Sequence, residues 1–113
     1  MPKAAAKKRE PKKSGVEVPP HISLRRCILE NLYEIFKAYP YAAVELRQIE
    51  ESCCVSPEDL NWNMVYLEKR GYLELGKSVE CPPYVAPTVT LTADGIDLIE
   101  DPLEFNRRFP NPE

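Results

Sequence analysis

The segment from Ser56 to Gly71 constrains the fold more than any other part of the sequence, because it carries signals for both ends of one helix. Ser56 is expected to cap the helix, and Pro57 suits the first helical position, where a backbone N–H would be unpaired anyway. Gly71 is expected to end the helix, since glycine adopts the left-handed conformation at little cost. The apolar residues between them recur on one helical face: Leu60, Met64 and Leu67.

Two further helices are predicted before this segment. The first is expected to start at Ser23, as its N-cap, and to run to about residue 38, because the Tyr39–Pro40 step disfavours the helical conformation. The second covers about residues 44–54 and turns Leu46, Ile49 and Cys53 inward. Only Val55 and Ser56 separate the second helix from the third.

Two short strands are predicted at residues 72–75 and 88–92, joined by a proline-rich loop that cannot form a central strand. Thr92 and Asp101 are expected to cap two last helices, residues 93–100 and a shorter one that follows. The predicted class is mainly α with a small antiparallel β-hairpin. The expected core consists of Leu24, Ile28, Leu32, Ile35, Leu46, Ile49, Leu60, Met64, Leu67, Leu73, Leu91, Ile96 and Ile99.

Charge divides the chain of 113 residues into two parts. Residues 1–20 hold six basic and two acidic residues and few large apolar side chains, so a disordered basic arm is predicted there. Residues 21–113 hold nine basic and sixteen acidic residues, with one domain expected over 21–109 and a frayed end over 110–113. No apolar run is long enough to cross a membrane, and a cytoplasmic location is expected.

Metal, cofactor and enzyme chemistry find little support in the sequence. Cys27, Cys53, Cys54 and Cys81 lack the spacing of a zinc site, and they are interpreted as reduced residues, two of them in the core, with any redox role left open. His21 is the single histidine, and no glycine-rich phosphate loop is present. We therefore predict no enzyme activity, no cofactor and no metal site.

The order helix, helix, helix, strand, loop, strand, helix resembles the winged helix-turn-helix family of prokaryotic transcription regulators. The resemblance covers about residues 22–100 and is carried by the segments VELRQIEESCCVSPEDLNWNMVYLEKRGYLEL and VTLTADGIDLIE. It implies a three-helix core with a wing and C-terminal helices. It also implies that the third helix, residues 57–70, enters the major groove of double-stranded DNA while the loop follows the backbone or the minor groove.

Two functions remain open on this basis. In a DNA-binding transcription regulator, basic side chains and the arm would contact phosphates. Asn61, Asn63 and Tyr66, together with Glu58, would lie nearest the bases. The candidate DNA-binding residues are Arg25, Arg26, Arg47, Asn61, Asn63, Tyr66, Lys69, Arg70 and Lys77. The family pattern is broken by Glu58 and Asp59, which place two carboxylates at the start of the helix.

The alternative function is a protein–protein interaction module without DNA binding. Trp62 and Tyr66 lie four residues apart on the third helix and would anchor a partner protein, although packing against the first helix or the wing fits them equally. A homodimer through residues 101–109 is a further possibility, because Leu103, Phe105 and Phe109 are apolar. Folding of these side chains onto the first helix of the same chain is the competing expectation.

Overall fold

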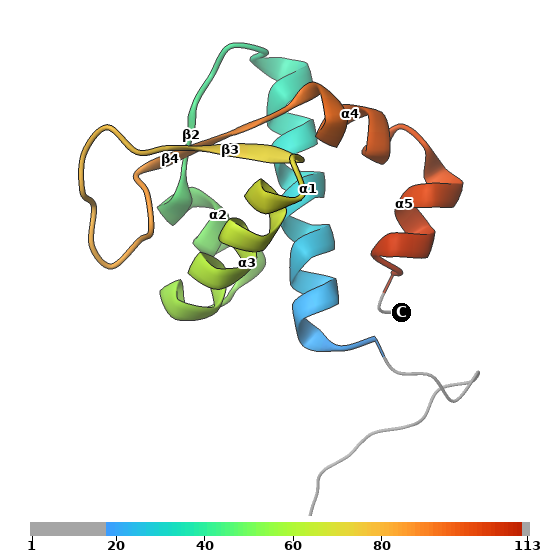
Figure 1. Ribbon diagram of the computed structural model, residues 1–113, viewed down its shortest axis with the longest axis horizontal. Coiled ribbons are helices and arrows are strands. Elements are labelled where there is room, and N and C mark those ends of the chain that lie inside the picture. Colours follow the sequence, from blue (N-terminus) through green and yellow to red (C-terminus); the bar gives the residue numbers. More distant parts are fainter. Residues whose placement is uncertain (1–17, 112–113) are drawn as a thin grey trace, which may run out of the picture.

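The protein, in a computed structural model that describes residues 18–111, is mainly helical with one small antiparallel sheet (Figure 1). The predicted fold class is confirmed at this level. Most of the predicted arm, residues 1–17, and the last two residues lie outside the described part of the chain. The elements are α1 (Pro20–Ala38), β2 (Val44–Glu45), α2 (Leu46–Cys53), α3 (Pro57–Lys69), β3 (Leu73–Gly76), β4 (Thr88–Leu91), α4 (Ala93–Ile99) and α5 (Pro102–Arg108).

The sheet has three strands in the order β2-β4-β3, not the two that were predicted. Val44 pairs with Val89 on one side of β4, and Leu73 pairs with Leu91 on the other, both antiparallel. The assignment of residues 44 and 45 to the second helix was therefore wrong. Val44 is a buried residue of β2, and its pairing with Val89 outweighs the local helical pattern that continues from Leu46.

Three of the predicted helix caps are confirmed by hydrogen bonds. Ser56 Oγ accepts from the Asp59 N–H at 3.1 Å, and Thr92 Oγ1 accepts from the Gly95 N–H at 3.1 Å. Asp101 Oδ1 accepts from the N–H of Glu104 at 3.2 Å, and Gly71 follows α3 with a φ of 83°. These signals were reliable because donor and acceptor are only three residues apart.

The predicted start of the first helix was wrong. The helix α1 begins at Pro20 with Pro19 as its N-cap, four residues before the predicted N-cap Ser23. The carbonyl of Pro19 accepts hydrogen bonds from the N–H groups of Ile22 and Ser23 at 3.0 and 3.2 Å. Pro20 extends the helix because its fixed φ suits the first helical position.

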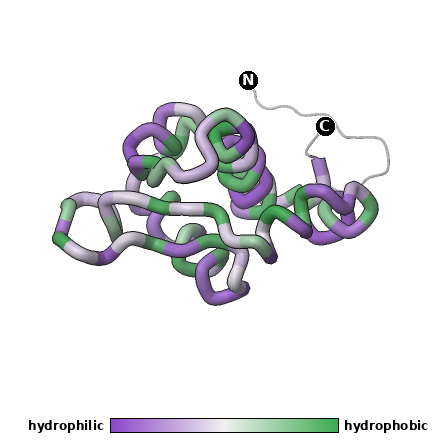
Figure 2. The backbone as a smooth tube through the Cα atoms, turned by 90° about the horizontal axis from the view of Figure 1, so that it is seen from above, coloured by the Kyte–Doolittle hydropathy of each residue, from purple (hydrophilic) through white to green (hydrophobic). Residues whose placement is uncertain are grey.

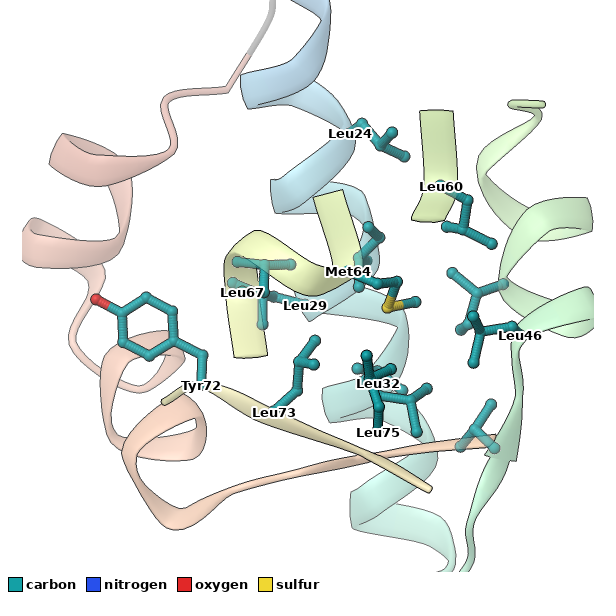
Figure 3. Packing of buried hydrophobic residues seen from close by; sticks show 14 of the residues in the cluster. Leu24, Leu29, Leu32, Leu46, Leu60, Met64, Leu67, Tyr72, Leu73 and Leu75 are labelled. Atoms are coloured by element: carbon teal, nitrogen blue, oxygen red, sulfur yellow. The ribbon is translucent and has the colours of Figure 1, made fainter. Parts of the chain in front are cut away.

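The core lies between α1, α2, α3 and one face of the sheet (Figure 3). Ile35, Leu91, Ile96 and Ile99 are only partly buried, and in α4 it is Leu98 that is fully buried. The predicted buried face of α4, with Ile96 and Ile99, was therefore wrong, because this helix packs against the core through Gly95 and Leu98. The predicted core residues that are buried are Leu24, Ile28, Leu32, Leu46, Ile49, Leu60, Met64, Leu67 and Leu73.

A disulfide joins Cys27 on α1 to Cys53 on α2, with the two Cα atoms 6.1 Å apart. Asn31 Nδ2 lies 3.3 Å from the sulfur of Cys27 and 3.7 Å from that of Cys53. The prediction that these cysteines are reduced was wrong for this pair, because packing of the two helices brings them together. Cys54 and Cys81 are free, and Cys54 is exposed.

The hairpin and the C-terminal helix lie at opposite ends of the molecule. The strands β3 and β4 run side by side to the loop 77–87 at one end, and α5 lies at the other (Figures 1 and 2). Phe105 and Phe109 of the C-terminal segment are buried, and the ring of Phe109 contacts Tyr72 edge-on at 6.4 Å between centroids. Two of the three apolar side chains considered for a homodimer therefore pack inside their own chain, whereas Leu103 is 85% exposed.

Within residues 18–111, no helix combines the length and the apolar composition that a membrane span requires.

Candidate functional site

The helix α3 divides into an inner and an outer face. Its inner face buries Leu60, Asn63, Met64 and Leu67. Its outer face exposes Glu58, Asp59, Trp62, Lys69 and Arg70, with Asn61 and Tyr66 half-buried at the two edges. This arrangement follows from the helical period, which places residues three and four apart on the same side.

The loop 77–87 is held against α3 and α2 by hydrogen bonds of Asn61 and Tyr84, which were not predicted from the sequence. The amide of Asn61 donates to the carbonyl of Pro83 and accepts from the N–H of Val85, both at 2.8 Å. The hydroxyl of Tyr84 donates to the carboxylate of Glu50 on α2. This hydrogen bond, with burial as a smaller cause, raises the pKa of the Tyr84 hydroxyl. Asn61 is therefore engaged with the loop and is not free to contact a base.

Glu68 fixes the base of the same loop. Its carboxylate accepts from the N–H of Leu75 at 3.1 Å and forms an ion pair of 2.9 Å with Lys77. Burial disfavours its ionised form, but the hydrogen bonds from Lys77 and Leu75 outweigh burial and lower the pKa of Glu68. Lys77, a predicted phosphate contact, is thus partly neutralised by α3 itself.

Arg25 and Asn63 form a buried polar pair between α1 and α3. Arg25 Nε donates to Asn63 Oδ1 at 2.8 Å, and Asn63 Nδ2 donates to the carbonyl of Asp59 at 2.8 Å. The Arg25 guanidinium lies 3.7 Å from the ring centroid of Tyr66 and 5.5 Å from that of Trp62. Burial lowers the pKa of Arg25, and the neighbouring Tyr66 hydroxyl opposes this effect. Arg25 and Asn63, both candidate DNA-binding residues, therefore lie buried between the two helices.

The other basic residues predicted to contact phosphates differ in how exposed their side chains are. Arg26 is largely buried and donates to the side chain of Asn106 and the carbonyl of Phe109 at 2.8 and 2.7 Å. Arg47 is exposed, 3.6 Å from Glu45. Lys69 and Arg70 are exposed at the C-terminal end of α3, and a hydrogen bond with Tyr72 raises the pKa of Arg70. Of these predicted phosphate contacts, Arg26 is therefore turned inward, whereas Arg47, Lys69 and Arg70 are exposed.

The first half of α3 and the adjoining loop form a surface of different character. Trp62, which follows Asn61 on α3, is 50% exposed, and Val85, whose N–H donates to the Asn61 side chain, is 42% exposed. Glu58 and Asp59 stand exposed at the start of the same helix. We call Glu58, Asp59, Trp62 and Val85 the α3–loop surface, which combines exposed apolar area with negative charge.

No sequence signal pointed to the contacts that shape this surface. Asn61 and Tyr84 bond to groups 22 to 34 residues away in the chain, and neither position belongs to a recognisable motif. Comparison of the chain with protein-family models, with curated proteins and with solved structures finds no match.

Proposed function

We propose that the chain is a winged-helix module that binds a partner protein through the α3–loop surface. The observation that carries this proposal is the half-exposed Trp62 in the middle of α3, flanked by the exposed carboxylates of Glu58 and Asp59. Tryptophan at the centre of an exposed surface is typical of residues that contribute most to protein–protein affinity. The order of helices and strands supports the winged-helix assignment.

The Trp62 side chain is already oriented in the free protein. Its indole Nε1–H donates to Asp59 Oδ1 at 3.4 Å, and its ring centroid lies 5.8 Å from that of His21. A side chain held in one orientation loses less conformational entropy on binding than a mobile one. The neighbouring loop is held by Asn61 and Tyr84, so the surface needs little rearrangement to receive a partner.

The electrostatics of the surface favour a protein over DNA. Glu58 and Asp59 occupy the first turn of α3, which is the part of a recognition helix that approaches the DNA backbone and base edges. Carboxylates in that place repel phosphates, whereas Arg25 and Arg26 are turned into the protein. Lys69 and Arg70 lie at the far end of α3 and are the remaining exposed basic residues on this helix.

Site-specific photocrosslinking tests the proposal. A benzoylphenylalanine at position 85 should crosslink one defined protein in the native host, because Val85 lies in the α3–loop surface and only its backbone bonds to Asn61. The same group at Leu103, an even more exposed apolar position on α5, is the matched control. The identified protein, once purified, should bind the wild-type chain and lose most of its affinity for a folded Trp62→Ala variant. Identical crosslinks from both positions, or full binding by Trp62→Ala, would overturn the proposal.

A titration with labelled duplex DNA examines the competing function. We expect no specific binding at low salt. Affinity that falls with salt and is lost in Lys69→Ala/Arg70→Ala, but not in Trp62→Ala, would replace the proposed function by DNA binding.

A further inference from the structure

We propose that a cavity beside Trp62 receives a lysine or arginine side chain of the bound protein; this inference rests on the function proposed above. The cavity has a volume of about 220 Å³ and lies between the first turn of α1 and the first half of α3. Its lining includes Pro20, His21, Leu24, Val55, Trp62 and Asp59.

The size and the walls of the cavity fit one long side chain. Sites for independent small molecules are usually larger, roughly 300–1,000 Å³. Leu24 is buried, and Pro20, Val55 and the Trp62 ring add apolar wall. Lysine and arginine carry a methylene stem that packs on such walls while the charged group stays near water.

A carboxylate oxygen of Asp59 in the cavity lining remains available to a ligand. The Asn63 amide oxygen already accepts from Arg25, and its nitrogen already donates to the Asp59 carbonyl. Asp59 Oδ1 accepts the Trp62 indole N–H, whereas Asp59 Oδ2 has no hydrogen-bond partner within residues 18–111. An ammonium or guanidinium group can donate a charge-assisted hydrogen bond to an exposed carboxylate oxygen and form a cation–π contact with a neighbouring aromatic ring. The cavity therefore selects a cation over a neutral side chain.

Among the described residues, His21 in the cavity lining and Arg25, which bonds to the lining residue Asn63, are basic groups close to such a ligand. The Arg25 guanidinium lies 3.7 Å from the ring centroid of Tyr66, and Arg25 Nε donates to Asn63 of the cavity lining at 2.8 Å. Asp59 supplies a negative charge to the cavity lining, and Glu58 is exposed one residue before it. The position of Arg25 also shows that the aromatic pair Trp62 and Tyr66 accommodates a guanidinium.

Trp62 is the single tryptophan of the chain, so its fluorescence reports on this cavity directly. The full-length protein would be titrated with three capped tripeptides, glycine–X–glycine, in which X is arginine, lysine or norleucine. Norleucine supplies a similar stem without charge. We expect the arginine and lysine peptides to bind roughly five- to thirtyfold more tightly than the norleucine peptide, from one ion pair and one cation–π contact.

Three variants make the test specific. Asp59→Asn retains the shape of the side chain and should reduce the preference for arginine over norleucine to what the cation–π contact alone provides, while Asp59→Glu should retain most of it. Glu74→Gln removes an exposed carboxylate from β3 and should leave the preference unchanged. Circular dichroism would establish that each variant is folded. Equal affinity for the three peptides in the wild type, or an unchanged preference in Asp59→Asn, would overturn the inference.

The two proposals fail in different ways. If the peptides show no preference while the crosslinked protein still requires Trp62, the cavity assignment falls and the interaction surface stands. If the peptides show the preference but positions 85 and 103 crosslink the same proteins, the cavity stands and the proposed function falls.

Discussion

Arg25 on α1 and Asn63 on α3 are hydrogen-bonded to each other inside the protein, with Arg25 Nε 2.8 Å from Asn63 Oδ1. Arg25 is 8% exposed and Asn63 is 1% exposed. A buried guanidinium is costly unless its surroundings stabilise the charge, and here the amide oxygen and the Tyr66 ring do so. The pair thus ties the two helices together and is unavailable to DNA, although both residues looked like surface contacts in the sequence.

Replacing Asn63 by alanine should destabilise the protein by about 1–3 kcal/mol, because Arg25 Nε–H and the Asp59 carbonyl would both lose a buried partner. Urea unfolding followed by circular dichroism measures this change. Lys69→Ala, an exposed change on the same helix, serves as the control and should shift stability by no more than about 0.5 kcal/mol. Equal stability of Asn63→Ala and the wild type would show that Asn63 does not form this pair in solution.

Reduction of the disulfide should lower the free energy of unfolding by about 3–4 kcal/mol, because Cys27 and Cys53 are 26 residues apart and the bond restricts the unfolded chain. The melting temperature with and without reductant measures the effect. Cys27→Ser should reproduce it and make the protein insensitive to reductant, whereas Cys54→Ser, at an exposed free cysteine, should not. Alkylation of all four cysteines of the unreduced, denatured chain would contradict the disulfide.

The stability contributed by Glu68 should depend on pH. Its pKa in the folded protein is lower than the ordinary value of 4.5, since the hydrogen bonds from Lys77 and Leu75 outweigh the opposing effect of burial. The ionised carboxylate therefore stabilises the fold above that value, and the contribution disappears as the pH falls through the folded pKa. Glu68→Gln should be less stable than the wild type at neutral pH, and the difference should vanish in acid. Glu74→Gln, on exposed β3, should show no such convergence in the same denaturation series.

Gly95→Ala should destabilise α4 although alanine is the better helix former by about 1 kcal/mol. A Cβ at this position would lie 2.1 Å from the Tyr72 carbonyl oxygen and 3.0 Å from Leu91 Cδ1. The helix would have to move away from β3, and we expect a net loss of about 1–3 kcal/mol, as in other overpacked sites. Asp97→Ala, on the exposed side of the same helix, should be neutral or stabilising. A more stable Gly95→Ala protein would show that the close approach is absent.

Sequence reasoning succeeded where the deciding interaction is local. The caps at Ser56, Thr92 and Asp101 each join groups three residues apart, and the exit at Gly71 depends on one backbone conformation. The period of apolar residues also placed most core residues of α1, α2 and α3 correctly, although Ile35 is only partly buried. It did not place α4, where Leu98 is buried and Ile96 and Ile99 are not. A helix of seven residues has too few turns for the period to select one face.

The sequence by itself determined which segments are helical, three of the N-caps and most of the core, because those features depend on neighbours within about one turn of the chain. Only the tertiary structure decided which polar residues are free to bind. Arg25 reaches Asn63 across 38 residues, Cys27 reaches Cys53 across 26, and Tyr84 reaches Glu50 across 34. Such pairs form when packed helices and strands bring distant side chains within hydrogen-bonding distance, and no local pattern records that geometry. For this reason Arg25 and Arg26 are engaged within the protein, and the half-exposed Trp62 is the centre of the candidate surface.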